Sequence, residues 1–207
     1  RGLPKLVLLI EFDEETDAAA AEKVHTLARE FRRFQATVRE ALSDREREKY
    51  WLVRRESFTL LREKVTDRQT APFIDDCVVR PEVLPEFLPK LYEILDRYRL
   101  LYTIAGHVGD GNFHIIPLMD LSDEREREKI PRVAAEVFRL VLQHGGSLTG
   151  EHNDGLIRSP YLREEFGQEV YTLFERVKDI FDPQNIFNPG KKVGASQQYS
   201  FAHLKRG

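Results

Sequence analysis

The sequence predicts an α+β domain of ferredoxin-like type: an antiparallel sheet with helices on one face, a helical insertion, and a C-terminal helical segment. Apolar runs of strand length alternate with segments in which apolar residues recur every three to four positions. Two of these runs flank Asp110-Gly111, a dipeptide typical of the two-residue turn of a β-hairpin. The predicted order, β-α-β, a helical insert and then β-α-β-β-α, suits an antiparallel sheet covered on one face.

The first part of the chain is predicted to form a strand, a helix, a second short strand and a long charged helix, at residues 5–12, 16–34, 34–38 and 43–66. Thr16 or Asp17 can cap the first helix, because both side chains offer an oxygen to free backbone amides. Acidic and basic residues alternate over 44–49, which is typical of a solvated helix face.

The second part is predicted to hold the core. A strand at 73–80 ends at Pro81, and a helix at 82–98 carries an apolar stripe made by Leu84, Phe87, Leu88, Leu91 and Leu95. The hairpin strands at 101–107 and 112–118, a helix at 123–144, a short strand at 147–150, a helix near 160–180 and a rigid loop at 182–191 follow.

Composition limits the function classes. With 207 residues, 41% of them hydrophobic, the chain is long enough for one globular domain or slightly more. A net charge of −3 gives no general case for nucleic-acid binding. The single cysteine, Cys77, excludes an internal disulfide, fits a reducing compartment, and lies in an apolar run that predicts a buried thiol.

No apolar run is long enough to span a bilayer. Because the chain lacks an initiating methionine and enters a strand at once, we expect a fragment of a longer protein.

Two histidines bracket the predicted turn. If Asp110 and Gly111 are the whole loop, His107 lies directly opposite His114, with Cβ atoms roughly 5 Å apart. Two imidazoles so placed can share one divalent ion, and Glu151 and His152 offer a carboxylate and a third imidazole. A single histidine in a strand is more often a packed or surface residue, so the residues alone leave both interpretations open.

Three motifs resemble a known family. They are GHVGDGNFH at 106–114, GEHNDG at 150–155 and DPQNIFNPGK at 182–191, and in this order they are similar to the FAD-linked oxidase C-terminal domain. That family serves flavin enzymes that oxidise D-lactate, glycolate or D-2-hydroxyglutarate. The resemblance implies a substrate or cap domain over 1–146 and a segment at 147–193 that packs on a flavin-binding domain absent from this chain. It leaves 194–207 as a flexible tail or linker.

The resemblance also implies a role for individual residues. The metal ligands are expected to be His107, His114 and Glu151, and the general base His152, while Asp110 and Asn112 hold the turn and orient the ligand histidines. Arg54 is expected to bind the substrate carboxylate, with the alternative that it is one more charge on a solvated helix. Asn188 and Lys191 resemble a loop that approaches the flavin, with the alternative of a structural C-terminal turn.

The sequence departs from the common family pattern in two places. Asn153-Asp154 replaces the usual glycine-containing stretch, which resembles a branch of long bacterial proteins in which an iron–sulfur domain follows the dehydrogenase. Relatives specific for dicarboxylic acids place a lysine near the start of the strand before Pro81, and this chain has none there. The substrate side chain therefore stays open.

The function that the resemblance implies is the oxidation of a D-2-hydroxy acid to a 2-oxo acid by FAD, assisted by a divalent metal, zinc or manganese. The full-length parent is expected to be the enzyme, in the cytoplasm or peripheral at the inner face of the membrane, whereas the fragment alone is expected to be inactive. Two other classes stay open: a metallohydrolase using the same two histidines and glutamate, and a non-catalytic ferredoxin-like binding or dimerisation module.

Overall fold

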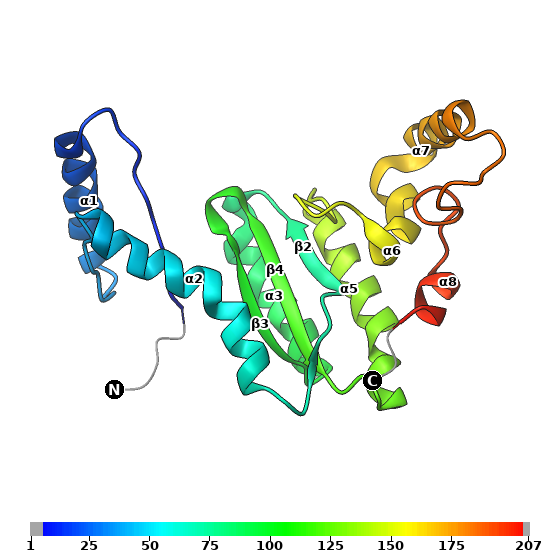
Figure 1. Ribbon diagram of the computed structural model, residues 1–207, viewed down its shortest axis with the longest axis horizontal. Helices are drawn as coiled ribbons and strands as arrows, with labels where there is room; N and C mark the ends of the chain where they lie inside the picture. The colour runs from blue at the N-terminus through cyan, green and yellow to red at the C-terminus, as the bar shows by residue number, and fades with distance from the viewer. Residues whose placement is uncertain (1–5, 205–207) are drawn as a thin grey trace. The chain divides into compact units, whose positions relative to one another are not determined.

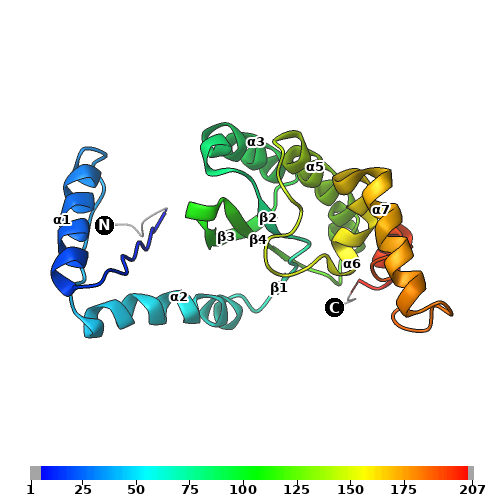
Figure 2. The same cartoon turned by 90° about the horizontal axis from the view of Figure 1, so that it is seen from above.

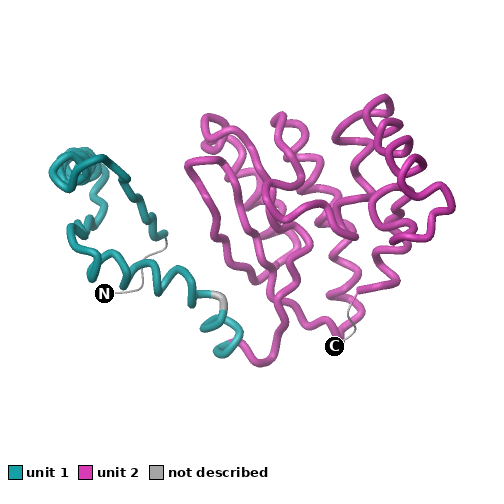
Figure 3. The backbone as a smooth tube through the Cα atoms, turned by 45° about the horizontal axis from the view of Figure 1, so that its top comes forward, with its two compact units in different colours: residues 1–64 teal, residues 65–207 magenta. Residues whose placement is uncertain are grey.

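The computed structural model describes residues 6–204, apart from the side chain of Phe58. The chain divides into two compact units, residues 1–64 and 65–207 (Figure 3). The boundary falls inside the range 1–146 that we predicted as one domain. Each unit is described by itself below.

The first unit is built from two helices, α1 (Asp17–Arg32) and α2 (Asp44–Lys64) (Figure 1). The Thr16 side chain accepts a hydrogen bond from the Ala19 backbone amide at 3.2 Å, which confirms Thr16 as the cap of α1. The predicted charged helix is confirmed as α2.

The strands predicted at 5–12 and 34–38 are not formed, and those two predictions are wrong over the described residues. Residues 6–12 are extended without a strand partner, and Leu6 and Val7 are 73% and 75% exposed. A turn occupies 33–35, where Gln35 has φ 56°. A strand is stable only as part of a hydrogen-bonded ladder, so apolar alternation without a neighbouring strand does not produce one. The first β-α-β of a ferredoxin-like fold is accordingly not formed within residues 6–204.

The second unit contains an open antiparallel sheet. Its strands are β1 (Gln69–Thr70), β2 (Ile74–Val78), β3 (Leu101–His107) and β4 (Asn112–Met119). Strand β4 is central, because it pairs with β3 along one edge and with β1 and β2 along the other. The strand predicted at 147–150 is reduced to one bridge between Ser147 and Val78.

Two helices cover one face of this sheet. A 3₁₀ turn (Pro81–Val83) leads into α3 (Leu84–Arg97), and α3 and α5 (Lys129–Gln143) lie side by side over the strands (Figure 2). The core beneath them includes Phe87, Leu91 and Leu95 from α3, Val133, Val137 and Phe138 from α5, and Ile74, Phe113 and Ile115 from the sheet. The α+β class and the predicted apolar stripe are therefore confirmed.

The helix predicted at 123–144 is interrupted. A short α4 (Glu124–Arg127) precedes α5, and the one residue between them, Glu128, lies three positions before Pro131. Proline has no amide hydrogen to donate to the carbonyl of Arg127, four residues earlier, and its ring crowds that carbonyl. The helical hydrogen bond that would join the two segments across Glu128 is therefore missing.

The C-terminal part is helical. It contains α6 (Gly155–Arg158), a 3₁₀ turn (Ser159–Tyr161), α7 (Leu162–Phe181) and α8 (Gln197–Ala202), with a kink in α7 at Gly167. Helix α8 lies where we expected a flexible tail: the Ser196 side chain caps it, and Ser200 donates a hydrogen bond to the Leu156 carbonyl. At least this part of the tail is packed.

The β3–β4 turn is longer than predicted. Residues Val108–Asp110 form a 3₁₀ turn and Gly111 is left-handed with φ 69°, so the loop has four residues, not two. The Gly111 carbonyl accepts a hydrogen bond from the Val79 amide at 3.0 Å. A Cβ atom on Gly111 would lie 1.7 Å from the Val79 carbonyl oxygen. Only glycine fits this position.

We expect Gly111→Ala to lower the free energy of unfolding by at least about 2 kcal/mol, because alanine would combine an unfavourable φ with a clash against backbone. Urea unfolding followed by circular dichroism measures the change. Gly109→Ala is the matched control, since a Cβ there meets nothing within 4 Å. Equal stability of the two variants would contradict the prediction.

Candidate metal centre

His107 and His114 lie on the same face of the hairpin. We predicted that they lie directly opposite one another, and that part of the prediction is wrong. His107 pairs with Asn112, and His114 pairs with Ala105. The true register differs from the predicted one by two residues, and a shift of two keeps each side chain on its original face. The rings are therefore diagonal neighbours, with centroids 5.8 Å apart. Phe113 and Ile115 alternate with them and enter the core, so the histidines occupy the sheet face opposite the helices.

Glu151 brings a carboxylate oxygen between the imidazoles. Its Oε1 atom lies 3.3 Å from His107 Nε2 and 3.1 Å from His114 Nε2. Two ligand atoms about 2.0–2.1 Å from one tetrahedral ion are roughly 3.3 Å apart. Each of the two imidazole nitrogens is therefore about as far from the Glu151 oxygen as two ligands of one divalent ion are from each other. His107 and Glu151 are about half exposed, which leaves this side of the cluster accessible.

The loop that carries Glu151 is held by the buried carboxylate of Asp76. Asp76 lies in β2 with φ 70°, at a bulge between Ile74 and Cys77. The donors to its two oxygens are the backbone amides of Gly150, Glu151 and His152, the Thr149 hydroxyl and the Asn112 side-chain amide, at 2.8–3.2 Å. A bulge redirects side chains and often occurs beside functional sites. Here it aims a carboxylate at three consecutive amides.

These hydrogen bonds decide the charge of Asp76. Burial by itself raises the pKa of the carboxyl, but the His152 amide, the Thr149 hydroxyl and the other donors outweigh burial, and the net pKa lies well below its usual range. Asp76 is therefore ionised at neutral pH and contributes a fixed negative charge beneath the cluster.

Four side chains, Asp76, His114, Glu151 and His152, each offer a ligand atom within 4.8 Å of the others and could hold a metal ion. Both oxygens of Asp76 already accept several hydrogen bonds. Making it a ligand would leave buried amides without partners, at about 1–3 kcal/mol each. Asp76 is therefore better suited to holding the loop than to binding a metal, which leaves His114, Glu151 and His152 of this group as possible ligands. His107 is not one of the four and joins the cluster through its 3.3 Å contact with Glu151.

His152 lies beside this cluster. Its Nε2 atom is 3.8 Å from Glu151 Oε1, and its ring stacks on that of His114 with centroids 4.8 Å apart. Its Nδ1 atom is 3.0 Å from a carboxylate oxygen of Asp75, and the side chain is 47% exposed. The structure thus brings the predicted base next to the predicted ligands.

The two residues expected to hold the turn differ in their surroundings. Asn112 is buried and donates to Asp76 at 3.0 Å, so it links the hairpin to the Glu151 loop. Asp110 is exposed in the turn, and no side-chain hydrogen bond joins it to another described residue. Its expected role stays a prediction.

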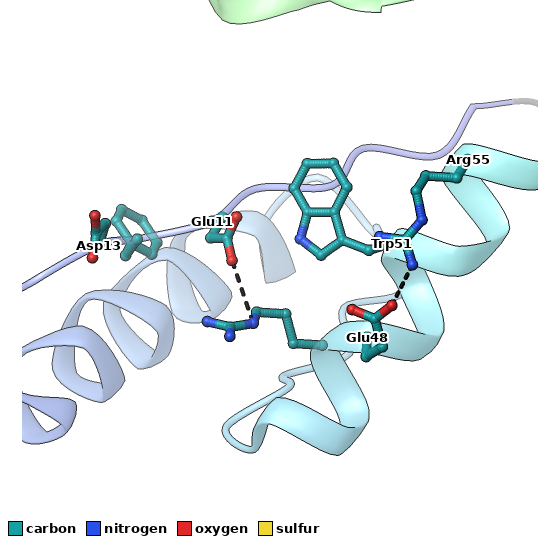
Figure 4. A pocket seen from close by; sticks show the side chains of 7 residues that line it. Glu11, Asp13, Glu48, Trp51 and Arg55 are labelled. Carbon is teal, nitrogen blue, oxygen red and sulfur yellow. Dashed lines mark hydrogen bonds and ion pairs between the residues drawn. The ribbon is translucent and has the colours of Figure 1, made fainter.

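Arg54 lies on α2 in the first unit, whereas the cluster lies in the second. The nearby pocket of the first unit, between the extended segment and α2, is lined by Trp51, Arg47 and Arg55 rather than Arg54 (Figure 4). Arg47 pairs with Glu11 at 3.6 Å, and Arg55 pairs with Glu48. Both arginines of this pocket therefore already have acidic partners.

Asn188 and Lys191 lie in the loop after α7. Asn188 is exposed with φ 47°, and its carbonyl accepts the Lys191 amide at 3.3 Å. The Lys191 ammonium donates to the Tyr199 hydroxyl at 2.7 Å and lies over the Tyr199 ring. The expected role of both residues at a flavin stays a prediction.

Sequence reasoning missed Asp75 and Asp76. The signal was present: two acidic residues interrupt an apolar strand between Ile74 and Cys77. Charged residues are almost never fully buried unless they are paired. A buried strand with adjacent carboxylates therefore indicates partners elsewhere in the chain. Cys77, by contrast, is buried as expected, and burial raises the pKa of its thiol to about 12.

Fold and cluster together define a domain with a candidate divalent-metal centre on the helix-free face of an antiparallel sheet. Residues 4–192 match the family described as FAD linked oxidases, C-terminal domain, and the chain belongs to this family. The expectation from the three motifs is confirmed. Among the described residues, no helix is both long and apolar enough to cross a membrane.

The chain is similar to three kinds of curated protein. It is 37% identical over 141 residues to D-2-hydroxyglutarate dehydrogenase of Pseudomonas putida, covering 68% of this chain and 14% of the relative. It is 31% identical over 195 residues to glycolate oxidase subunit GlcD of Bacillus subtilis, covering 92% and 40%. It is 36% identical over 120 residues to the mitochondrial D-lactate dehydrogenase [cytochrome] of Arabidopsis thaliana, covering 58% and 21%. The chain thus spans less than half the length of these relatives.

We expect Asp76→Asn to destabilise the second unit by about 3 kcal/mol at pH 7, because an amide cannot accept all the hydrogen bonds that the carboxylate accepts. The lowered pKa of Asp76 sets the pH dependence. The stabilisation is present above the unfolded-state pKa of about 3.9 and is lost as the pH falls through the folded-state pKa. The stability difference between wild type and variant should therefore shrink below about pH 4.

Urea titrations of both proteins between pH 3 and 8 measure this difference. Asp96→Asn, at an exposed aspartate of α3, is the control for the loss of one charge. A difference that stays constant down to pH 3 would contradict the role given to the Asp76 carboxylate.

Proposed function

We propose that this chain is the metal-binding and substrate-binding part of a flavin-dependent dehydrogenase that oxidises a D-2-hydroxy acid to the 2-oxo acid. The observation that carries the proposal is the Glu151 oxygen lying 3.1–3.3 Å from the Nε2 atoms of His107 and His114. Family membership supports the redox class, since the relatives are named as 2-hydroxy acid dehydrogenases and oxidases. FAD would be bound mainly by a domain outside this chain.

His107, His114 and Glu151 would hold the metal. A bound zinc or manganese ion would act as a Lewis acid toward the hydroxyl and carboxylate oxygens of the substrate. The exposure of His107 and Glu151 leaves room for such oxygens beside the protein ligands. Asp76, through the amides that it binds, keeps Glu151 in reach of the histidines.

His152 would accept the proton of the substrate hydroxyl at Nε2, because its Nδ1 atom faces Asp75. Arg54 would bind the substrate carboxylate through its two-pronged guanidinium group. Asn188 and Lys191 would lie toward the flavin, which would supply the redox chemistry.

The ligand set and the base can be separated by mutation. We expect the 207-residue chain to bind one divalent ion, and Glu151→Gln to weaken the binding at least 100-fold because it removes a charged ligand. His152→Ala should leave the affinity within a few-fold. In the enzyme that carries the flavin-binding domain, His152→Ala should lower turnover roughly 10²–10⁴-fold.

Titration calorimetry with Zn²⁺ and Mn²⁺ measures the affinity, and reduction of the flavin by D-lactate, glycolate and D-2-hydroxyglutarate measures turnover. Absence of metal binding by the wild-type chain would favour a non-catalytic binding module. Hydrolytic activity of the isolated chain with metal would favour a metallohydrolase.

The exposed side of the C-terminal segment supports its proposed contact with the flavin-binding domain. After the kink, α7 presents an apolar stripe at helical spacing, formed by Val170, Leu173, Val177 and Ile180. Leu173 and Ile180 are 54% and 73% exposed. Contiguous exposed apolar surface of this kind marks an interaction site. We assign the flavin-binding domain as its occupant, because the relatives extend far beyond the length of this chain.

The loop after α7 also exposes apolar side chains. The buried Asp182 carboxylate accepts the amides of Ile186 and Phe187 at 2.9 and 2.8 Å, and the Lys178 ammonium contacts it as well. Those amide contacts shape the turn, in which the Ile186 and Phe187 side chains are 63% and 70% exposed.

The great length of the D-2-hydroxyglutarate dehydrogenase relatives also supports the expected iron–sulfur domain in the parent.

We expect Leu173→Glu with Ile180→Glu to leave the unfolding midpoint of the isolated chain unchanged, because both side chains are exposed. In the protein that carries the flavin-binding domain, the same pair should reduce stability and flavin retention, since two carboxylates would be buried in an apolar contact. Thermal unfolding and flavin fluorescence measure both. Gln168→Glu, on the same helix, is the control. Unaltered flavin retention in the double variant would argue against this interface.

A further inference from the structure

Asp75 touches two histidines of the cluster with one carboxylate. Its Oδ1 atom is 3.0 Å from His114 Nδ1, and its Oδ2 atom is 3.0 Å from His152 Nδ1. The Asp75 and His114 side chains are 13% and 8% exposed. The two rings are nearly parallel, with an interplanar angle of 14°. One carboxylate thus spans a stacked pair of imidazoles.

An ionised carboxylate only accepts hydrogen bonds. Each Nδ1 atom that faces Asp75 therefore carries a hydrogen, and in a neutral ring this leaves the lone pair on Nε2. The Glu151 carboxylate faces the Nε2 atom of His114 at 3.1 Å and favours a hydrogen there as well, until a metal ion bound between the two atoms takes its place. We propose that Asp75 is the positioning residue that sets the tautomers of His114 and His152 together, so that both rings present Nε2 lone pairs to the metal side of the cluster.

The backbone keeps Asp75 in place. Its carbonyl oxygen accepts a hydrogen bond from the buried Arg158 guanidinium at 2.7 Å, and the same guanidinium also donates to the Asn153 carbonyl. The next residue, Asp76, is held by its own set of amides. Asp75 therefore has little freedom to leave either ring.

The contact with Asp75 orients both rings, and each ring then has a different role. On the proposed function, His114 uses its Nε2 lone pair as a metal ligand, and His152 uses its own to accept a proton. Glu151 Oε1 lies 3.1 Å from the first of these nitrogens and 3.8 Å from the second. A carboxylate behind a ligating histidine orients the ring, and its loss usually weakens metal binding 10–100-fold.

The tautomers can be read directly. In the ¹⁵N-labelled 207-residue chain near pH 8, without metal, long-range ¹H–¹⁵N correlation spectra distinguish rings protonated at Nδ1 from rings protonated at Nε2. We expect His114 and His152 both to be protonated at Nδ1. His144 is an internal reference, because its Nδ1 atom faces the Leu140 carbonyl at 2.8 Å. A His114 or His152 ring without a hydrogen on Nδ1 would overturn the proposal without any variant.

Asp75→Asn sharpens the test, because an amide has one oxygen that accepts and one nitrogen that donates. We expect one ring to keep its tautomer and the other to switch to Nε2-protonation, whereas Asp96→Asn should change neither. Asp75→Asn spectra in which both tautomers are unchanged would overturn the proposal.

The change in metal affinity should depend on which ring switches its tautomer. If His114 switches, Zn²⁺ affinity should fall roughly 10–100-fold; if His152 switches, it should stay within about threefold while turnover of the flavin-containing enzyme falls. A Zn²⁺ affinity that does not change in this way with the ring that switches would also count against the proposed role of Asp75. A wild-type chain that binds no divalent ion would remove the proposed function, and the spectra would still decide the role of Asp75.

Discussion

The carboxylate of Asp76 is the interaction on which the metal centre depends. The sheet supplies two histidines on rigid strands, but Glu151 and His152 come from a loop with no ladder of its own. Asp76 replaces that ladder by accepting three consecutive amides of the loop. Each hydrogen bond to a charged group is worth about 1.5–3 kcal/mol, and together they offset the cost of burying the charge. The left-handed φ of Asp76 is a strain that these contacts compensate.

The bulge in β2 explains how adjacent residues can serve one site. In a regular strand Asp75 and Asp76 would point to opposite faces. The register shift between Ile74 and Cys77 breaks this alternation, so both carboxylates reach the side of the cluster. One binds imidazoles and the other binds backbone. The chemistry of the site thus rests on an irregularity that periodicity cannot anticipate.

The sequence predicted the elements whose structure is determined by local pattern. It did not predict those that depend on residues distant in the chain, such as a neighbouring strand or a hydrogen-bond partner. The helices, the hairpin strands and the core stripe of α3 follow from periodicity. The hairpin register was wrong by two residues, yet the histidines remained neighbours because an even shift preserves the face. The strands expected at 5–12 and 34–38 have the right pattern without a pairing partner. Asp75 and Asp76 were missed because their partners lie some 40 to 75 residues away in sequence.

The two halves of the candidate site differ in what holds them, and this difference links metal binding to folding. His107 and His114 are fixed by the β3–β4 ladder, whereas Glu151 reaches them through a loop whose amides are bound by the Asp76 carboxylate. Glu151 is about half exposed, and its backbone amide is held by the Asp76 carboxylate. Binding energy from an ion shared by all three ligands would appear partly as stability of that loop. Asp75 has a comparable effect on the imidazole rings of His114 and His152. Rings that are oriented in advance lose less conformational entropy when an ion binds.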